Sequence, residues 1–222
     1  MTKKRDKNKI FVLPNEDKDR WQEPLDHNNI ANFRRGFKML ISGRPSCGKT
    51  NLIKSIIIHQ EPEFDDIYIC HIDQSTREYE DTDGKMMNIS ELPEPEEIND
   101  DMKLLVIIED ADFDGVSRRD KEKINKYLRY VCSHRGLSLI IACQDPFAIA
   151  STYRKKIDIF ILFRFDPTTL AILAKKCELT KEEFKYLFEH HITGRHDCLC
   201  VDLTGSPYLI RKNLFEVLRK IN

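Results

Sequence analysis

The stretch Gly43-Arg44-Pro45-Ser46-Cys47-Gly48-Lys49-Thr50 decides the fold, because it matches the phosphate-binding P-loop (Walker A) pattern G-x-x-x-x-G-K-[ST]. A short and mostly apolar run, residues 37–42, precedes it and is typical of a buried strand. Residues 49–58 follow with apolar side chains at helical spacing, so they predict a helix. Strand, loop and helix in this order are the context that the motif requires, which favours a nucleotide-binding site over a turn that binds nothing.

The residue types in the loop explain how it would hold a phosphate chain. Gly43 and Gly48 allow backbone angles that turn successive N–H groups toward one anion, and the following helix adds the partial positive charge of its N-terminus. We expect the Lys49 ammonium to contact the β- and γ-phosphates and the Thr50 hydroxyl to bind Mg²⁺. The predicted cofactors are therefore ATP and Mg²⁺, and the predicted nucleotide-binding residues are Gly43, Arg44, Pro45, Ser46, Cys47, Gly48, Lys49, Thr50 and Asn51.

Composition limits the class of protein. The 222 residues suit one α/β domain, which we place at residues 32–222, after a charged N-terminal arm at residues 1–31. A formal net charge of −1 gives no global signal for nucleic acid, so contact with DNA would need a local basic surface. The seven scattered cysteines fit reduced core residues in a cytosol-like compartment. No apolar run approaches the ~20 residues of a membrane span.

A second motif lies downstream of the loop. Residues 104–108 are five consecutive apolar residues, typical of a buried parallel strand, and Glu109-Asp110 follows them in the Walker B manner. The carboxyl end of such a strand opens onto the ligand crevice. We expect Glu109 to hold Mg²⁺ and Asp110 to position the attacking water, with Asp112 as a further candidate. Surface acids capping an ordinary strand are the alternative.

Gln144 ends another buried strand, residues 137–143, in a position to touch the γ-phosphate or the water. A glutamine that only caps a turn explains the same pattern. The remaining predicted elements are strands at 66–72 and 157–163, a solvated excursion at 73–102, helices at 117–134, 146–156, 167–176 and 180–190, a hairpin of strands 198–201 and 208–211, and a helical tail at 213–222.

Two further clusters invite a function. His190, His191, His196, Cys198 and Cys200 could bind zinc, but C-x-C with upstream histidines is not a standard zinc pattern, and burial of both cysteines on one strand face explains them better. The basic run Arg154-Lys155-Lys156 could contact DNA phosphates, whereas a solvated turn explains it equally well.

Four blocks of sequence together resemble one family. They are the P-loop block, LLVIIEDAD at 104–112, SHRGLSLIIACQDP at 133–146 and IDIFILFRFDPTTLAILAKKCEL at 157–179. In this combination the chain resembles the viral genome-packaging ATPases of the FtsK/HerA superfamily, especially those of poxviruses, other large DNA viruses and virophages. The resemblance covers about residues 32–215.

The resemblance implies a RecA-like P-loop NTPase, with a mostly parallel sheet, helices on both faces and a C-terminal hairpin. It implies that the strand ending in Gln144 lies between the Walker A and Walker B strands, so that Gln144 senses the γ-phosphate. It further implies a homo-oligomeric ring of six subunits that pumps double-stranded DNA, with a capsid or portal protein as partner and the host cytoplasm or virion as location. Arg135 matches the family's arginine finger, which acts in trans, and Arg118 and Arg119 are rivals.

The chain departs from the family pattern at the acidic pair, because Glu precedes Asp at positions 109 and 110. Pro45 and Cys47 also replace small residues, and Pro45 removes one N–H donor. Other functions remain open: a translocase or helicase that does not package DNA, a P-loop nucleotide kinase, or a nucleotide-gated assembly module without turnover. Water activation by the acidic pair and Gln144 favours hydrolysis over the kinase.

Overall fold

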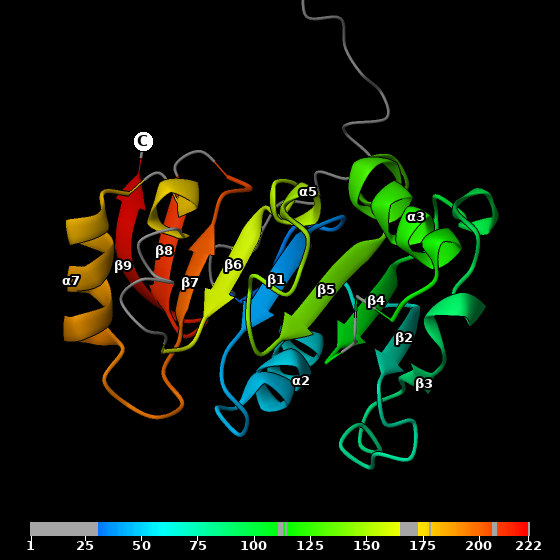
Figure 1. Ribbon diagram of the computed structural model, residues 1–222, viewed down its shortest axis with the longest axis horizontal. Helices are drawn as coiled ribbons and strands as arrows, with labels where there is room; N and C mark the ends of the chain where they lie inside the picture. The colour runs from blue at the N-terminus through cyan, green and yellow to red at the C-terminus, as the bar shows by residue number, and fades with distance from the viewer. Residues whose placement is uncertain are drawn as a thin grey trace, which may run out of the picture.

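A nine-stranded sheet in the order β3-β2-β4-β5-β1-β6-β7-β8-β9 forms the centre of the molecule (Figure 1). The computed structural model describes residues 31–110, 113, 115–164, 173–177, 179–205 and 208–221. The strands are β1 Lys38–Ser42, β2 Asp66–His71, β3 Lys85–Met86, β4 Leu104–Glu109, β5 Ser138–Cys143, β6 Ile159–Leu162, β7 Leu199–Asp202, β8 Tyr208–Lys212 and β9 Glu216–Ile221. Strands β1 to β6 pair in parallel, and β7 to β9 extend the sheet in antiparallel fashion.

Helices cover both faces of this sheet, as predicted. The helices are α2 Lys49–His59, α3 Arg118–Lys126, a π-helical turn Tyr127–Val131, α4 Cys132–Arg135, α5 Ser151–Arg154 and α7 Lys181–His191, with short 3-10 turns at Ile89–Glu91, Pro95–Glu97 and Lys175–Cys177. Along β4, Leu105 and Ile107 pack with α2, whereas Val106 and Ile108 pack with the α3 side. Successive side chains of β4 thus point alternately into two apolar cores, one on each face of the sheet. Both sets must be apolar, which explains the unbroken apolar run.

The strand order confirms an expectation that came from the family resemblance. β5 pairs with β1 on one side and with β4 on the other, so Gln144 follows the strand between the P-loop strand and the strand that ends in Glu109. The carboxyl ends of these three parallel strands meet at one edge of the sheet. None of the helices in the described part of the chain is long and apolar enough to cross a membrane.

The predicted helical tail is wrong. Residues 216–221 form β9, which pairs antiparallel with β8, so the predicted hairpin becomes a three-stranded extension. Apolar residues at positions 214, 217, 218 and 221 mimic helical spacing, yet without β9 the edge of β8 would leave its backbone groups unpaired. Asn213, with φ 55, turns the chain, and its N–H donates to the carbonyl of Cys198 over 2.7 Å.

The segment 73–102 is more than the solvated insertion that we predicted. Lys85–Met86 adds a parallel strand beside β2, and Tyr79, Leu92 and Ile98 are buried. The 73–102 sequence shows no periodicity because isolated side chains, rather than one continuous face, pack onto the core.

Two other predicted segments fall largely outside the described residues. The predicted arm at 1–31 lies outside them except for Ala31, which is fully buried. Most of the predicted helix 167–176 also lies outside them.

All seven cysteines are buried free thiols, as predicted. Cys198 and Cys200 belong to the apolar cluster on the α2 side of the sheet, so their shared strand face is a core face. Burial raises the pKa of Cys200 to about 11, which keeps it a neutral thiol at physiological pH.

A buried ion pair ties the C-terminal extension together, and its removal should be costly. Arg211 of β8, 1% exposed, donates from Nη2 to Oδ2 of Asp202 in β7 over 2.7 Å. We expect Arg211→Leu to lower the free energy of unfolding by about 3–5 kcal/mol, because the buried Asp202 carboxylate loses this partner. Urea unfolding measures the loss. The control is Arg219→Leu, which breaks an exposed pair with Glu183 and should cost under about 1 kcal/mol. Equal losses in the two variants would contradict this account.

Candidate nucleotide-binding site

The P-loop has the backbone that its glycines predict. Gly48 has φ 109, a conformation that side chains rarely adopt, and caps the start of α2. At Gly43 the restriction is space, since a Cβ would lie 2.6 Å from both the Cys47 Sγ and the Phe163 Cβ. Both positions therefore need glycine to bring the loop over the end of β1.

Lys49 lies over this loop. Its side chain is buried, and its Nζ donates to the carbonyl oxygens of Gly43 over 3.1 Å and of Arg44 over 3.5 Å. These contacts hold the ammonium at the loop centre, where phosphate oxygens can replace the carbonyl oxygens as acceptors.

The residues predicted to contact the γ-phosphate, the Mg²⁺ ion and the attacking water meet in one pocket of about 510 Å³ at the carboxyl edge of the sheet, whereas Arg44 and Cys47 line a neighbouring hollow. Lys49 and Thr50 reach it from the start of α2, whereas Glu109 and Asp110 lie at the end of β4 and Gln144 follows β5. Its full lining is Pro45, Ser46, Gly48, Lys49, Thr50, Asn51, Lys54, His71, Glu78, Glu109, Asp110, Gln144 and His196.

The donor atoms at Thr50 and Glu109 fit Mg²⁺. The Thr50 Oγ1 lies 2.9 Å from the Glu109 Oε1, and the Glu109 side chain is almost fully buried. Hydroxyl and carboxylate oxygens are the hard ligands that Mg²⁺ prefers. These two residues would therefore hold the ion where the sequence predicts.

Asp110 takes a constrained backbone conformation. It has φ 49, in the left-handed region that aspartate tolerates better than most residues, and its N–H donates to the carbonyl of Ala142 in β5 over 3.0 Å. Strained residues of this kind concentrate at functional sites. The turn places Asp110 in the pocket beside Gln144. The further candidate Asp112 lies outside the described residues.

Sequence reasoning missed four residues of the site. The buried Tyr79 hydroxyl donates to the Glu109 Oε2, and the Glu78 Oε2 lies 3.1 Å from the Thr50 Oγ1. Burial and the Glu109 charge raise the pKa of Tyr79 well above its usual range, so the phenol stays a donor. His71 lines the pocket, as does His196, whose Nδ1 donates to the Cys47 carbonyl over 2.9 Å. No motif marks these positions; only the place of Glu78 and Tyr79 a few residues after a predicted strand hints at those two.

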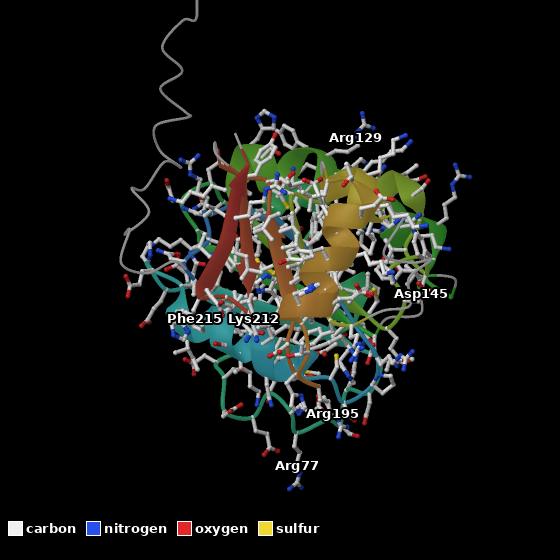
Figure 2. The ribbon with its side chains drawn as sticks, turned by 90° about the vertical axis from the view of Figure 1, so that its left-hand side faces the viewer. Arg77, Arg129, Asp145, Arg195, Lys212 and Phe215 are labelled. Atoms are coloured by element: carbon white, nitrogen blue, oxygen red, sulfur yellow. The ribbon has the colours of Figure 1, made fainter. Side chains whose placement is uncertain are left out.

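A second hollow of about 500 Å³ shares Pro45 with the nucleotide pocket. It is lined by Arg44, Pro45, Cys47, Arg164, Thr193, Gly194 and Arg195. Figure 2 shows Arg195 at the same end of the molecule as Arg77, opposite to Arg129. Three of its lining residues are arginines, so this hollow is basic.

The three candidate arginine fingers lie away from the nucleotide pocket of their own chain. Arg135 precedes β5 at the amino edge of the sheet, where its Nη1 donates to the carbonyls of Pro95, Glu96 and Ile98 over 2.8–3.1 Å. Arg118 and Arg119 are exposed at the start of α3, where they pair with Glu122 and Glu94.

The predicted DNA-binding run divides into two parts. Arg154 is tied to its own segment, because its Nη1 donates to the carbonyls of Pro146 and Ile149 and its guanidinium lies 4.7 Å from the Phe147 ring centroid. Lys155 and Lys156 instead line a hollow of about 600 Å³ between α3 and α5. We call this hollow the basic groove; its lining is Arg118, Lys121, Glu122, Asn125, Arg129, Thr152, Tyr153, Lys155 and Lys156.

Comparison with known proteins establishes the fold. No protein-family model and no curated protein sequence matches this chain. The genome-packaging NTPase B204 of Sulfolobus turreted icosahedral virus 2, in complex with sulfate, superposes with a TM-score of 0.58 at 16% identity, over 83% of this chain and 100% of B204. The DNA-packaging ATPase B204 of Sulfolobus turreted icosahedral virus gives 0.53 at 18% identity, over 79% and 97%. This chain has the fold of a viral genome-packaging NTPase.

A secretion ATPase shares this fold. The cytoplasmic domain of the type VII secretion ATPase EccC of Thermomonospora curvata superposes with a TM-score of 0.51 at 16% identity, over 80% of this chain and 24% of EccC. These likenesses confirm the predicted RecA-like α/β fold.

Proposed function

We propose that this chain is an ATPase that drives double-stranded DNA into a preformed viral capsid. The observation that carries the proposal is the single pocket that unites Lys49, Thr50, Glu109, Asp110 and Gln144. The fold neighbours support it, since B204 was crystallised with ATP-γ-S and with AMPPCP. The resemblance of the sequence to packaging ATPases supports the role of DNA as the substrate that is moved.

We propose a task for each group of the pocket. The loop N–H groups and Lys49 bind the phosphates, with Lys49 exchanging the Gly43 carbonyl for phosphate oxygens. Thr50 and Glu109 would hold Mg²⁺, which would neutralise phosphate charge. Asp110 orients the attacking water, and the Gln144 amide contacts the γ-phosphate from the end of β5.

Residues 144–156 would link this chemistry to DNA. They run from Gln144 to the lysines of the basic groove, and Arg154 fastens α5 to Pro146 and Ile149 within them. A shift of Gln144 on loss of the γ-phosphate would therefore move Lys155 and Lys156 as one body. We propose that the basic groove binds DNA phosphates.

The assembly is part of the same proposal. We propose a homo-oligomeric ring of six subunits that docks on a capsid or portal protein, in the host cytoplasm and the virion. The trans arginine finger stays a prediction, with Arg135 as the first candidate. Its three carbonyl contacts would have to be exchanged for contacts to a neighbour's nucleotide.

One experiment separates a DNA motor from the nucleotide kinase and from the assembly module. ATP hydrolysis by the purified protein is measured with duplex DNA, with single-stranded DNA and without nucleic acid. We expect duplex DNA to stimulate turnover. Turnover that needs a small-molecule phosphate acceptor and ignores DNA would favour a nucleotide kinase, and ATP binding with negligible turnover would favour a nucleotide-gated assembly module. Either result would reject the motor.

A further inference from the structure

A strand end that the P-loop motif does not mention faces the Mg²⁺ side of the pocket. His71 ends β2 and is the direct register partner of Glu109, which ends β4. Partners in a parallel pair point to the same side of the sheet. Ligand atoms of His71, Glu78 and Glu109 lie within 4.8 Å of one another.

The turn after β2 fixes the orientation of the first of these groups, His71. The His71 Nδ1 contacts the backbone of Asp73, at 2.8 Å from its carbonyl oxygen and 2.9 Å from its nitrogen. The Asp73 Oδ1 accepts from both the N–H and the hydroxyl of Ser75, which tightens the turn. With Nδ1 engaged, Nε2 is the ring nitrogen available to a ligand. A backbone contact of this kind orients metal-binding histidines in many proteins.

The two short contacts of the Thr50 hydroxyl indicate a place for a cation. Its Oγ1 lies 2.9 Å from a Glu109 oxygen and 3.1 Å from a Glu78 oxygen, yet a hydroxyl carries a single proton. One of these two oxygen–oxygen contacts therefore has no proton in it, so a lone pair of the Thr50 oxygen faces a lone pair of a carboxylate oxygen. A divalent ion among these oxygens removes the repulsion.

Tyr79 prepares Glu109 for this task. Tyr79 is 3% exposed, and its hydroxyl donates to the Glu109 Oε2. That contact occupies one carboxylate oxygen and leaves Oε1 directed toward Thr50.

We propose that His71, Glu78 and Glu109 form a divalent-cation site beside Thr50, with Tyr79 as the residue that positions Glu109. The site rests on the proposed function, because it would hold the ion that accompanies ATP, but it goes beyond the two ligands that the motifs predict. An imidazole ligand favours Mn²⁺, Co²⁺ and Zn²⁺ over Mg²⁺ more than an all-oxygen site does. The motor is thereby expected to accept Mn²⁺ well.

Mn²⁺ alone is the probe, read by electron paramagnetic resonance on the full chain without nucleotide or DNA. We expect one bound Mn²⁺ whose pulsed spectrum shows coupling to an imidazole nitrogen. His71→Asn should abolish that coupling, and His71→Asn, Glu78→Gln and Tyr79→Phe should each weaken Mn²⁺ binding about tenfold. His190→Asn, on the exposed end of α7, is the matched control and should change neither.

Thermal unfolding without metal separates ligation from folding, because Tyr79→Phe keeps the buried ring. Mn²⁺ binding without nitrogen coupling, or with unchanged affinity in His71→Asn and Glu78→Gln, would overturn the proposed site. Neither readout involves hydrolysis or DNA, so the site can fail while the motor stands. Conversely, a site confirmed by these spectra would survive a negative test of DNA-stimulated turnover.

Discussion

Lys49→Ala is expected to lower ATP turnover by about 10²–10³-fold, the usual effect of removing one preorganised charge from a transition state. The buried ammonium lies at the centre of the loop, and no other cation of the described pocket occupies that position, since Lys54 forms an ion pair with Asp81. A steady-state assay with saturating ATP, with and without duplex DNA, measures the loss. Binding of a fluorescent ATP analogue should weaken as well, because Lys49 contacts phosphates in the ground state too.

The matched control is Lys185→Ala. Lys185 sits on the exposed surface of α7 in a pair with Glu189, so the variant removes the same charge without touching the site. Its turnover should equal that of the unaltered protein. Residual turnover in Lys49→Ala above about a tenth of the normal rate would contradict the assignment of this loop as the catalytic P-loop.

The parts of the fold that could be predicted are those set by local chemistry. The continuous apolar runs before Gly43, Glu109 and Gln144 give buried parallel strands, because such strands must be apolar on both faces. Polar residues directly after such runs then fall at one sheet edge. The meeting of Gly43, Glu109 and Gln144 in space follows, although their neighbouring strand order came from the family resemblance.

The parts that could not be predicted depend on partners distant in the sequence. Tyr79 is polar enough to be expected at the surface, and only the fold brings it against Glu109, thirty positions away. Likewise, Arg154 belongs to a basic run, yet the carbonyls of Pro146 and Ile149 turn its guanidinium inward. Residue type gives the chemistry that a side chain can perform, whereas the tertiary structure selects its target.

The second large effect is expected on DNA binding, from substitutions in the basic groove. This groove brings Arg118, Lys121 and Arg129 from the α3 side together with Lys155 and Lys156 near α5, whereas Glu122 is its one acid and pairs with Arg118 over 3.2 Å. Burial and the nearby Arg129 charge lower the pKa of Lys156, so like charges are crowded there. A polyanion would relieve this crowding.

The double variant Lys155→Glu, Lys156→Glu is therefore expected to weaken duplex DNA binding about 10–100-fold at low salt, because two phosphate contacts become repulsive. The slope of log affinity against log salt should fall by about 2. Basal ATP turnover should persist, since Lys155 and Lys156 precede β6 at the amino edge of the sheet, away from the nucleotide pocket. Fluorescence anisotropy with labelled duplex DNA measures both quantities.

The control Lys181→Glu, Lys185→Glu makes the same change in net charge on α7. If the basic groove binds DNA, only Lys155→Glu, Lys156→Glu abolishes the stimulation of ATP turnover by DNA. If both pairs weaken binding equally, the effect belongs to the overall charge of the molecule and the groove is not the DNA contact. DNA affinity, the salt slope and basal turnover are measured separately. If the basic groove binds DNA, the double variant Lys155→Glu, Lys156→Glu must show weaker DNA binding and a smaller salt slope, with unchanged basal turnover.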